Sequence, residues 1–246
     1  MQAAGVQASE QSSWLDPEEP IVTFQIALVG CDGLVIGSDR LGRYVPVIGG
    51  LPKLPQIVRQ RKYCVSDNGS LICFASGGPM GVNLARRILA ECDPESILKG
   101  KTESQWEEAV RQLAAVQQSG GSGSAPPAPD QILIARSDVV DSFWMLLIRA
   151  DTKVVLIKME EQFFCAGAST VAQFLPRHLW NNKRSISDLQ KLALLTLSYA
   201  AQEEPSSVGP PFDIMTLDQT GQISWSVHDP MHEKFQSGLE ALFLES

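Results

Sequence analysis

The sequence predicts an α+β protein built from paired antiparallel sheets. Short apolar segments with alternating periodicity recur along the chain, which is typical of half-buried strands. Two pairs of them flank the turn sequences Cys31-Asp32-Gly33 and Asp67-Asn68-Gly69, which favour hairpins. A longer segment, Ser187 to Glu203, carries apolar residues at helical spacing. The order along the chain, strands, two helices, strands, two helices, strands, favours antiparallel sheets with helices packed against them.

The first half of the chain contains two expected hairpins and two expected helices. Phe24, Ile26 and Leu28 alternate along a first strand, and a second strand follows the first turn. The next hairpin and the helices come from segments with equally clear turn and cap signals. These segments are strands 62–66 and 71–75, a helix opened by 76–79 that ends near 92–94, and a helix over 103–118.

The second half opens with a connector rich in Gly, Ser and Pro over 119–130, which we interpret as a flexible surface loop. The helix from Ser187 to Glu203 has Ser185 or Ser187 as its cap. The remaining elements follow from apolar runs between turn signals. They are strands 132–135, 143–148 and 154–157, a strand 163–169 leading into a helix through Leu175 and Leu179, and closing strands 212–217 and 223–227.

Composition excludes several classes of function. The chain has 246 residues, a net charge of −8 and a pI near 4.9, which argues against a nucleic-acid partner. No segment is long and apolar enough for a membrane helix, so we expect no membrane partner. Five scattered cysteines without a C-x-x-C spacing argue against a disulfide framework or a metal site and indicate a cytoplasmic protein. We expect no cofactor.

The predicted domain organisation is simple. Residues 1–21 lack the apolar core of a signal peptide and are expected to be a disordered leader or propeptide. A single domain is expected over 22–228, and residues 229–246 form a C-terminal tail. The short basic cluster Arg59 to Lys62 is expected to be solvated or to lie at a subunit contact.

The first hairpin suggests a site. Its geometry places Thr23, at the start of the first strand, beside Asp39, at the end of the second. This arrangement resembles the N-terminal hairpin of proteasome β-type subunits and their bacterial relatives, in the N-terminal-nucleophile hydrolase superfamily. In that family a lysine follows in a Lys-hydrophobic-x-x-Ile context, which here matches Lys53. The helix with Tyr-Asp-Arg that begins α-type subunits is absent before residue 22.

The resemblance implies a fold and a mechanism. It implies a four-layer αββα sandwich over residues 22–228, with two antiparallel sheets between helix pairs. It also implies threonine-type peptide-bond hydrolysis inside a self-compartmentalising ring. Thr23 would be the nucleophile after removal of residues 1–22, and its own α-amino group would be the base. Asp39 and Lys53 would be the acid and the ammonium beside it.

The family motifs also point to supporting residues, with departures. Family members carry a Gly-Ser-Gly motif, which falls here on Ala166-Gly167-Ala168, with Ser169 next in the chain. A later Asp-x-x-Ser-Gly motif falls on the segment with Glu204 and Ser207. Val22 replaces the glycine that usually precedes the nucleophile.

Three functions remain open at this stage. The first is the peptidase, with other copies or related subunits in the ring as partners, an unfolded polypeptide as substrate and an ATPase unfoldase as a further candidate partner. The second is a non-catalytic structural subunit that assembles without processing. The third is an amidase of the same superfamily that acts on a small amide.

Overall fold

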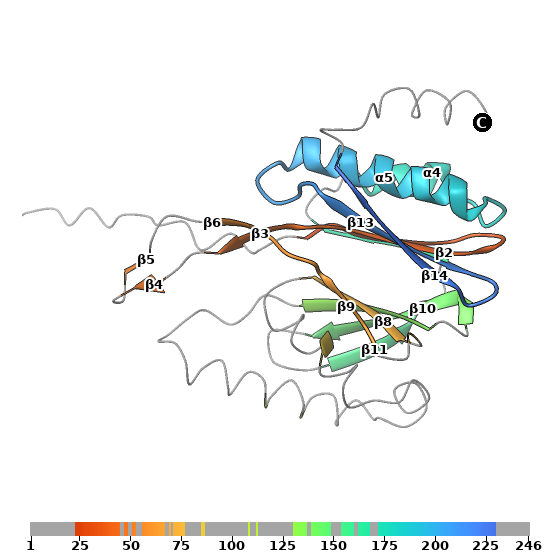
Figure 1. Cartoon of the computed structure of the whole chain (residues 1–246), viewed down its shortest axis with the longest axis horizontal. Helices are drawn as coiled ribbons and strands as arrows, with labels where there is room; N and C mark the ends of the chain where they lie inside the picture. The colour runs from red at the N-terminus through yellow and green to blue at the C-terminus, as the bar shows by residue number, and fades with distance from the viewer. Residues whose placement is uncertain are drawn as a thin grey trace, which may run out of the picture.

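The computed structural model places two five-stranded antiparallel sheets face to face (Figure 1). It describes residues 23–44, 47–48, 51–52, 56–66, 69, 71–76, 85–86, 108, 112, 130–136, 139–148, 154–159, 162–167 and 172–229. The leader, most of the C-terminal tail, the 119–129 connector and most of both helices expected between residues 76 and 118 lie outside these residues. Within them, Ala85, Arg86, Glu108 and Gln112 are helical.

The first sheet is the one that carries the N-terminal hairpin. Its strand order is β12-β1-β2-β13-β14, and each neighbouring pair is antiparallel. The strands are β1 (Gln25–Val29), β2 (Gly33–Asp39), β12 (Phe163–Ala166), β13 (Phe212–Asp218) and β14 (Ile223–His228). All five match segments that the apolar periodicity predicted.

The second sheet has the order β11-β10-β9-β8-β7. Its strands are β7 (Tyr63–Val65), β8 (Leu71–Ser76), β9 (Asp130–Arg136), β10 (Val139–Ile148) and β11 (Val154–Lys158). Two short strand pairs that the apolar periodicity did not predict lie between β2 and β7 along the chain. They pair β3 (Leu41–Tyr44) with β6 (Gln56–Arg59), and β4 (Val47–Ile48) with β5 (Leu51–Pro52).

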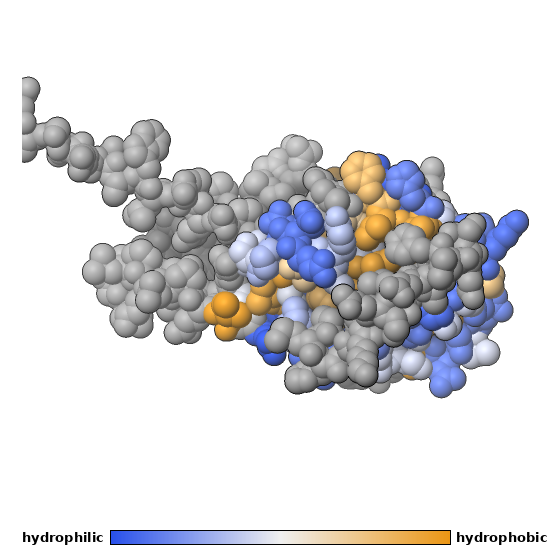
Figure 2. Space-filling view, turned by 90° about the horizontal axis from the view of Figure 1, so that it is seen from above, coloured by the Kyte–Doolittle hydropathy of each residue, from blue (hydrophilic) through white to orange (hydrophobic). Residues whose placement is uncertain are grey.

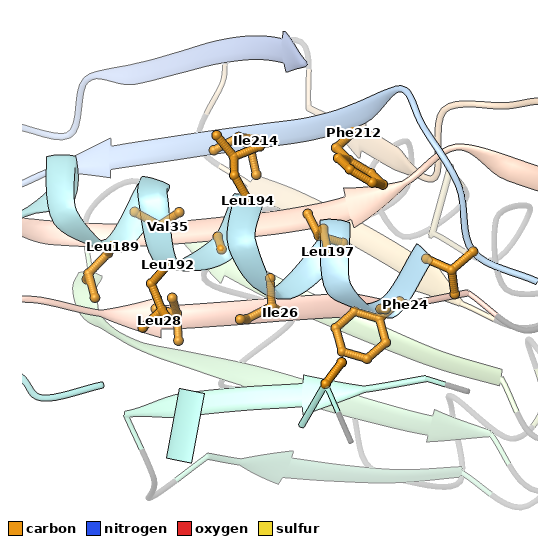
Figure 3. Close-up of a cluster of buried hydrophobic side chains, with 14 residues drawn as sticks. Phe24, Ile26, Leu28, Val35, Leu189, Leu192, Leu194, Leu197, Phe212 and Ile214 are labelled. Carbon is orange, nitrogen blue, oxygen red and sulfur yellow. The ribbon is translucent and has the colours of Figure 1, made fainter. Parts of the chain in front are cut away.

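Two helices, α4 (Phe174–Leu179) and α5 (Ile186–Glu203), pack on the outer face of the first sheet (Figure 1). The backbone N–H of Asp188 donates to the Ser185 hydroxyl at 3.3 Å, so Ser185 is the N-cap of α5. A buried apolar cluster between α5 and the first sheet packs the helix on β1, β2 and β13 (Figure 3). Phe24, directly before β1, and the β1 residues Ile26 and Leu28 contribute to it.

The opposite face of the first sheet forms the second core. Ala27 and Ile36 point away from α5 and pack against the second sheet, whose contribution includes Phe74 and Leu133. This strict alternation explains why every residue of β1 and β2 is buried, since both faces of the sheet are covered.

The predicted four-layer αββα sandwich is wrong. In the part of the chain that the structure describes, α4 and α5 are the two helices, and they cover one sheet only. The molecule there is mostly β, with three layers: helices, first sheet, second sheet. The prediction placed two further helices, one opened by 76–79 that ends near 92–94 and one over 103–118, and four residues in this part of the chain are described as helical.

On the helix-covered side, hydrophilic side chains form most of the coloured surface, with smaller hydrophobic areas between them (Figure 2). The large apolar side chains that are most exposed in the described part of the chain are scattered: Ile57, Phe174 and Val227. Among the described helices, none has the length and apolar character needed to cross a membrane.

Candidate functional site

The first hairpin brings Thr23 and Asp39 to the same end of the first sheet. Gln25 pairs with Ser38, so Phe24 lies opposite Asp39 when the register is continued. Thr23, the residue before Phe24, therefore lies at the same end of the sheet as Asp39. The backbone N–H of Phe24 donates to Asp39 Oδ1 at 3.0 Å, and the N–H of Asp39 donates to the Phe24 carbonyl at 3.3 Å. Thr23 is only 3% exposed in the intact chain. Its neighbourhood therefore contains a buried carboxylate.

The cation that meets this carboxylate is Lys62. Its Nζ donates to Asp39 Oδ1 at 2.9 Å, to Asp39 Oδ2 at 3.0 Å and to the Leu41 carbonyl at 2.7 Å. The Lys62 side chain is 7% exposed and that of Asp39 is fully buried. A charge pair this enclosed persists because each oxygen and each N–H has a partner.

Burial acts on the titration of both groups. It raises the pKa of the Asp39 carboxyl, while Lys62 and the backbone N–H groups of Phe24 and Gly209 oppose that rise. Burial lowers the pKa of the Lys62 ammonium, against the attraction of Asp39. Desolvation thus favours the neutral form of each partner, and the direct contact between them favours the charged forms.

A second ion pair involves Arg40, the residue that directly follows β2. Arg40 donates from Nε to Asp213 Oδ2 at 2.8 Å and from a terminal nitrogen to Asp213 Oδ1 at 2.5 Å. Asp213 is on β13, so this bidentate contact ties the end of β2 to its neighbouring strand. Tyr63, next to Lys62 in sequence, stacks on Trp225 of β14 with ring centroids 4.1 Å apart.

Gly167 lies against the start of the first strand. Its φ is +144°, and a Cβ at this position would overlap the Thr23 carbonyl and would lie 2.8 Å from Phe24 Cα. Only glycine adopts this positive φ without strain and also leaves room for the backbone of Thr23 and Phe24. The residue that the family motif singled out therefore sets how closely the end of β12 approaches Thr23.

Glu204 and Ser207 belong to the turn after α5. Glu204 ends the helix, and its carbonyl accepts the backbone N–H groups of Ser207 and Val208, both at 2.9 Å. The same turn presents the N–H of Gly209 to Asp39. This segment contacts the charge pair through its backbone.

The remaining predicted residues, Lys53 and Ser169, lie outside the described residues. Sequence reasoning missed Lys62, which it placed in a basic cluster expected to be solvated or at a subunit contact. For Lys62 the solvated alternative is wrong, because its side chain is buried against Asp39. The available signal was its position directly before the strand 63–65. No group of three or more His, Cys, Asp or Glu within the described ranges could hold a metal ion.

Comparisons with protein-family models and with curated proteins find no match. Solved structures do match. Anbu (ancestral beta-subunit) from Yersinia bercovieri superposes with a TM-score of 0.61 at 14% identity, covering 91% of this chain and 97% of that chain. Anbu from Hyphomicrobium sp. strain MC1 gives 0.59 at 14% identity, with coverages of 90% and 94%. A helical assembly of the Anbu complex from Pseudomonas aeruginosa gives 0.60 at 15% identity, with coverages of 91% and 96%.

These matches correct the expected resemblance. The three matching structures named above are Anbu proteins, a related group distinct from the proteasome β-type subunits expected from the hairpin. The chain therefore has the fold of Anbu proteins. At 14–15% identity this likeness concerns the fold alone.

Proposed function

We propose that this chain is the precursor of a threonine-type peptidase in which Thr23 becomes the nucleophile when residues 1–22 are removed. The single observation that carries the proposal is the buried Lys62–Asp39 pair at the end of the hairpin. Its carboxylate accepts the backbone N–H of Phe24, the residue directly after Thr23. A buried ammonium beside a hydroxyl is what a threonine nucleophile requires.

Each residue has a role in this proposal. The free α-amino group of Thr23, with an ordinary pKa of roughly 7.7–8.0, accepts the proton of the hydroxyl. The hydroxyl oxygen attacks the carbonyl carbon of the scissile peptide bond. The C–N bond then breaks, the departing amine takes the proton from the α-ammonium, and water hydrolyses the remaining acyl-enzyme. Lys62 favours loss of the Thr23 proton through its charge, and Asp39 holds Lys62 in place. Lys62 thereby takes the role that the family motif assigned to Lys53. Gly167, Glu204 and Ser207 shape the surrounding backbone.

Assembly from copies of this chain is part of the proposal. The Anbu complex from Pseudomonas aeruginosa forms a helical assembly. We propose that this chain likewise associates with itself, and that the domain responsible spans residues 22–228. Light scattering gives the mass of the assembly, and negative-stain microscopy distinguishes a closed ring from a helical one.

A specific observation favours the alternative of a non-catalytic structural subunit. Thr23 is 3% exposed, so little of its side chain is open to a substrate. A chain that keeps residues 1–22 would also have no free amine at Thr23, because that nitrogen would remain in a peptide bond.

Intact-mass measurement tests the proposal. The purified chain should lose residues 1–22 on incubation and then hydrolyse fluorogenic peptides, and a β-lactone probe should acylate Thr23. Thr23→Ala should remain full-length and inactive, whereas Thr23→Ser should retain partial processing. Lys62→Met should reduce kcat/KM by a factor of about 10²–10³, the usual effect of removing one preorganised charge. A full-length wild-type chain that takes up no probe would support the structural alternative.

A further inference from the structure

Two cysteines face each other across the β7–β8 pair. The register places Cys64 directly opposite Cys73, and neither is in a disulfide. Direct cross-strand partners project from the same face of a sheet. Their neighbours Tyr63 and Phe74 point into the core between the sheets. Both cysteines therefore project from the outer face of the second sheet.

The spacing of the pair fits a disulfide. The backbone N–H of Ala75 donates to the Lys62 carbonyl at 2.8 Å, and these two residues lie opposite each other when the β7–β8 register is continued. Hydrogen-bonded pairs recur every second residue, so Cys64 and Cys73 also form such a pair. Hydrogen-bonded pairs have Cα atoms about 5.5 Å apart, within the roughly 4.4–6.8 Å range of disulfides. Their Cβ atoms, about 4.5–5.5 Å apart, have to approach each other by roughly 1 Å for the bond to close, and such strain makes a disulfide easier to reduce.

The two thiols differ in their surroundings. Cys64 is half-buried and its sulfur interacts with the Arg86 side chain, whereas Cys73 is fully buried. Burial raises the pKa of Cys64, and the guanidinium of Arg86 opposes this rise. Cys64 is thus the thiol that an external reagent reaches, and Cys73 is the thiol that resolves the product.

We propose that Cys64 and Cys73 form a reversible cross-strand disulfide when the chain meets a low-molecular-weight disulfide. The Cys64 thiolate attacks one sulfur of the reagent, forms a mixed disulfide and releases one thiolate. The Cys73 thiolate then attacks the Cys64 sulfur and displaces the second thiolate. The two protein thiols lose two protons and two electrons, and the reagent is reduced to two thiols.

The position of the pair gives the disulfide a structural effect. β7 has three residues and lies at the edge of its sheet, so it has a partner strand on one side only. Edge strands of this length open locally with little cost. Lys62, the partner of Asp39, comes directly before β7. A covalent link from Cys64 to β8 would hold this edge closed and keep Lys62 at Asp39, whether or not Thr23 acts as a nucleophile.

The test uses the full-length chain in glutathione redox buffers, with the remaining thiols alkylated before mass analysis. Oxidising buffer should produce a species lighter by two hydrogens, with Cys64 and Cys73 joined in one peptide pair under non-reducing digestion. Cys165→Ser, a matched control on the other sheet, should form the same link. Arg86→Met should slow its formation severalfold.

Hydrogen exchange gives a second readout that requires no activity. Amide exchange over residues 62–66 should slow at least about fivefold in the oxidised chain, since opening of β7 now requires β8 to open as well. The proposal is overturned if both thiols remain alkylatable in fully oxidised glutathione, or if the product stops at a mixed disulfide on Cys64. An unchanged rate of amide exchange over residues 62–66 would show that the disulfide does not hold β7 closed. Failure of peptide hydrolysis in the earlier experiment would leave these readouts unaffected.

Discussion

At the scale of single residues, Lys62 is the most consequential side chain in the described part of the molecule. Its three donors are all used, two by Asp39 and one by the Leu41 carbonyl. Asp39 in turn accepts the backbone N–H groups of Phe24 and Leu41 as well. Removal of either partner therefore leaves a buried group of the other charge without its counterion.

Substitution of Lys62 by Met should lower the free energy of unfolding by roughly 3–5 kcal/mol near pH 8, the usual cost of a buried unpaired charge. Burial already raises the pKa of Asp39, and Lys62 is the main group opposing it. Without Lys62 the folded chain should bind a proton at Asp39 more readily than the unfolded chain does. Stability of Lys62→Met should then decline as pH rises through the raised pKa, so its deficit should be smaller at pH 5 than at pH 8.

Urea unfolding of Lys62→Met and of the double variant Asp39→Asn with Lys62→Met, at both pH values, measures this effect. The double variant has no titrating group at the site, so its own free energy of unfolding should not change between pH 5 and pH 8 on account of this pair. An equal deficit of Lys62→Met at both pH values would contradict the assignment of the effect to Asp39.

At the scale of elements, the approach of β12 to β1 depends on Gly167. A side chain there has to overcome both the positive φ and the contact with the backbone of Thr23 and Phe24. Gly69 also has a positive φ, at +69°, but nothing lies within 4 Å of its Cβ position. A side chain at Gly69 would cost only the free energy of the unfavourable backbone conformation, whereas a side chain at Gly167 would cost this and the steric overlap as well.

Gly167→Ala should lower the free energy of unfolding by about 2–4 kcal/mol, and Gly69→Ala by about 1 kcal/mol, since the second pays only for its backbone conformation. Thermal and urea unfolding of the two variants checks the difference. Equal losses would show that the contact between β12 and the Thr23 backbone relaxes freely.

Most elements could be predicted because they carry local signals. Alternation identified β1, and the apolar run 34–36 after the Asp-Gly turn identified β2. The cap and the apolar stripe of 187–203 identified α5. The β3–β6 hairpin was missed because its four-residue strands carry Gly42, Arg43 and Arg59 in place of an apolar pattern. The position of Asp39 followed from hairpin geometry. Lys62 could not be placed in the same way, because its approach to Asp39 depends on the intervening segment and on the packing of two sheets.

At the scale of the whole molecule, an apolar core and a set of aromatic contacts join the two sheets. Trp225 belongs to the first sheet, whereas Tyr63 and Phe74 belong to the second. Trp225 stacks on Tyr63 at 4.1 Å and lies 6.0 Å from Phe74. Such contacts add to the area buried between the layers.

Trp225→Ala should therefore destabilise the chain by roughly 2–4 kcal/mol and should accelerate amide exchange over residues 62–66. Trp225→Phe keeps an aromatic ring at the interface and should lose less than half as much. Denaturant unfolding and hydrogen exchange together check the prediction; loss of stability without faster exchange at 62–66 would mean that the stack does not restrain β7.

The Asp39–Lys62 contact links the two layers: Asp39 ends a strand of the first sheet, and Lys62 directly precedes a strand of the second. A sliding motion between the layers would pull the two charges apart even if neither strand changed its own conformation. Binding of a neighbouring molecule that shifts one layer by a fraction of a strand spacing would thus alter the electric field at Thr23 from a distance. The hairpin end is in this sense mechanically coupled to the alignment of the sandwich.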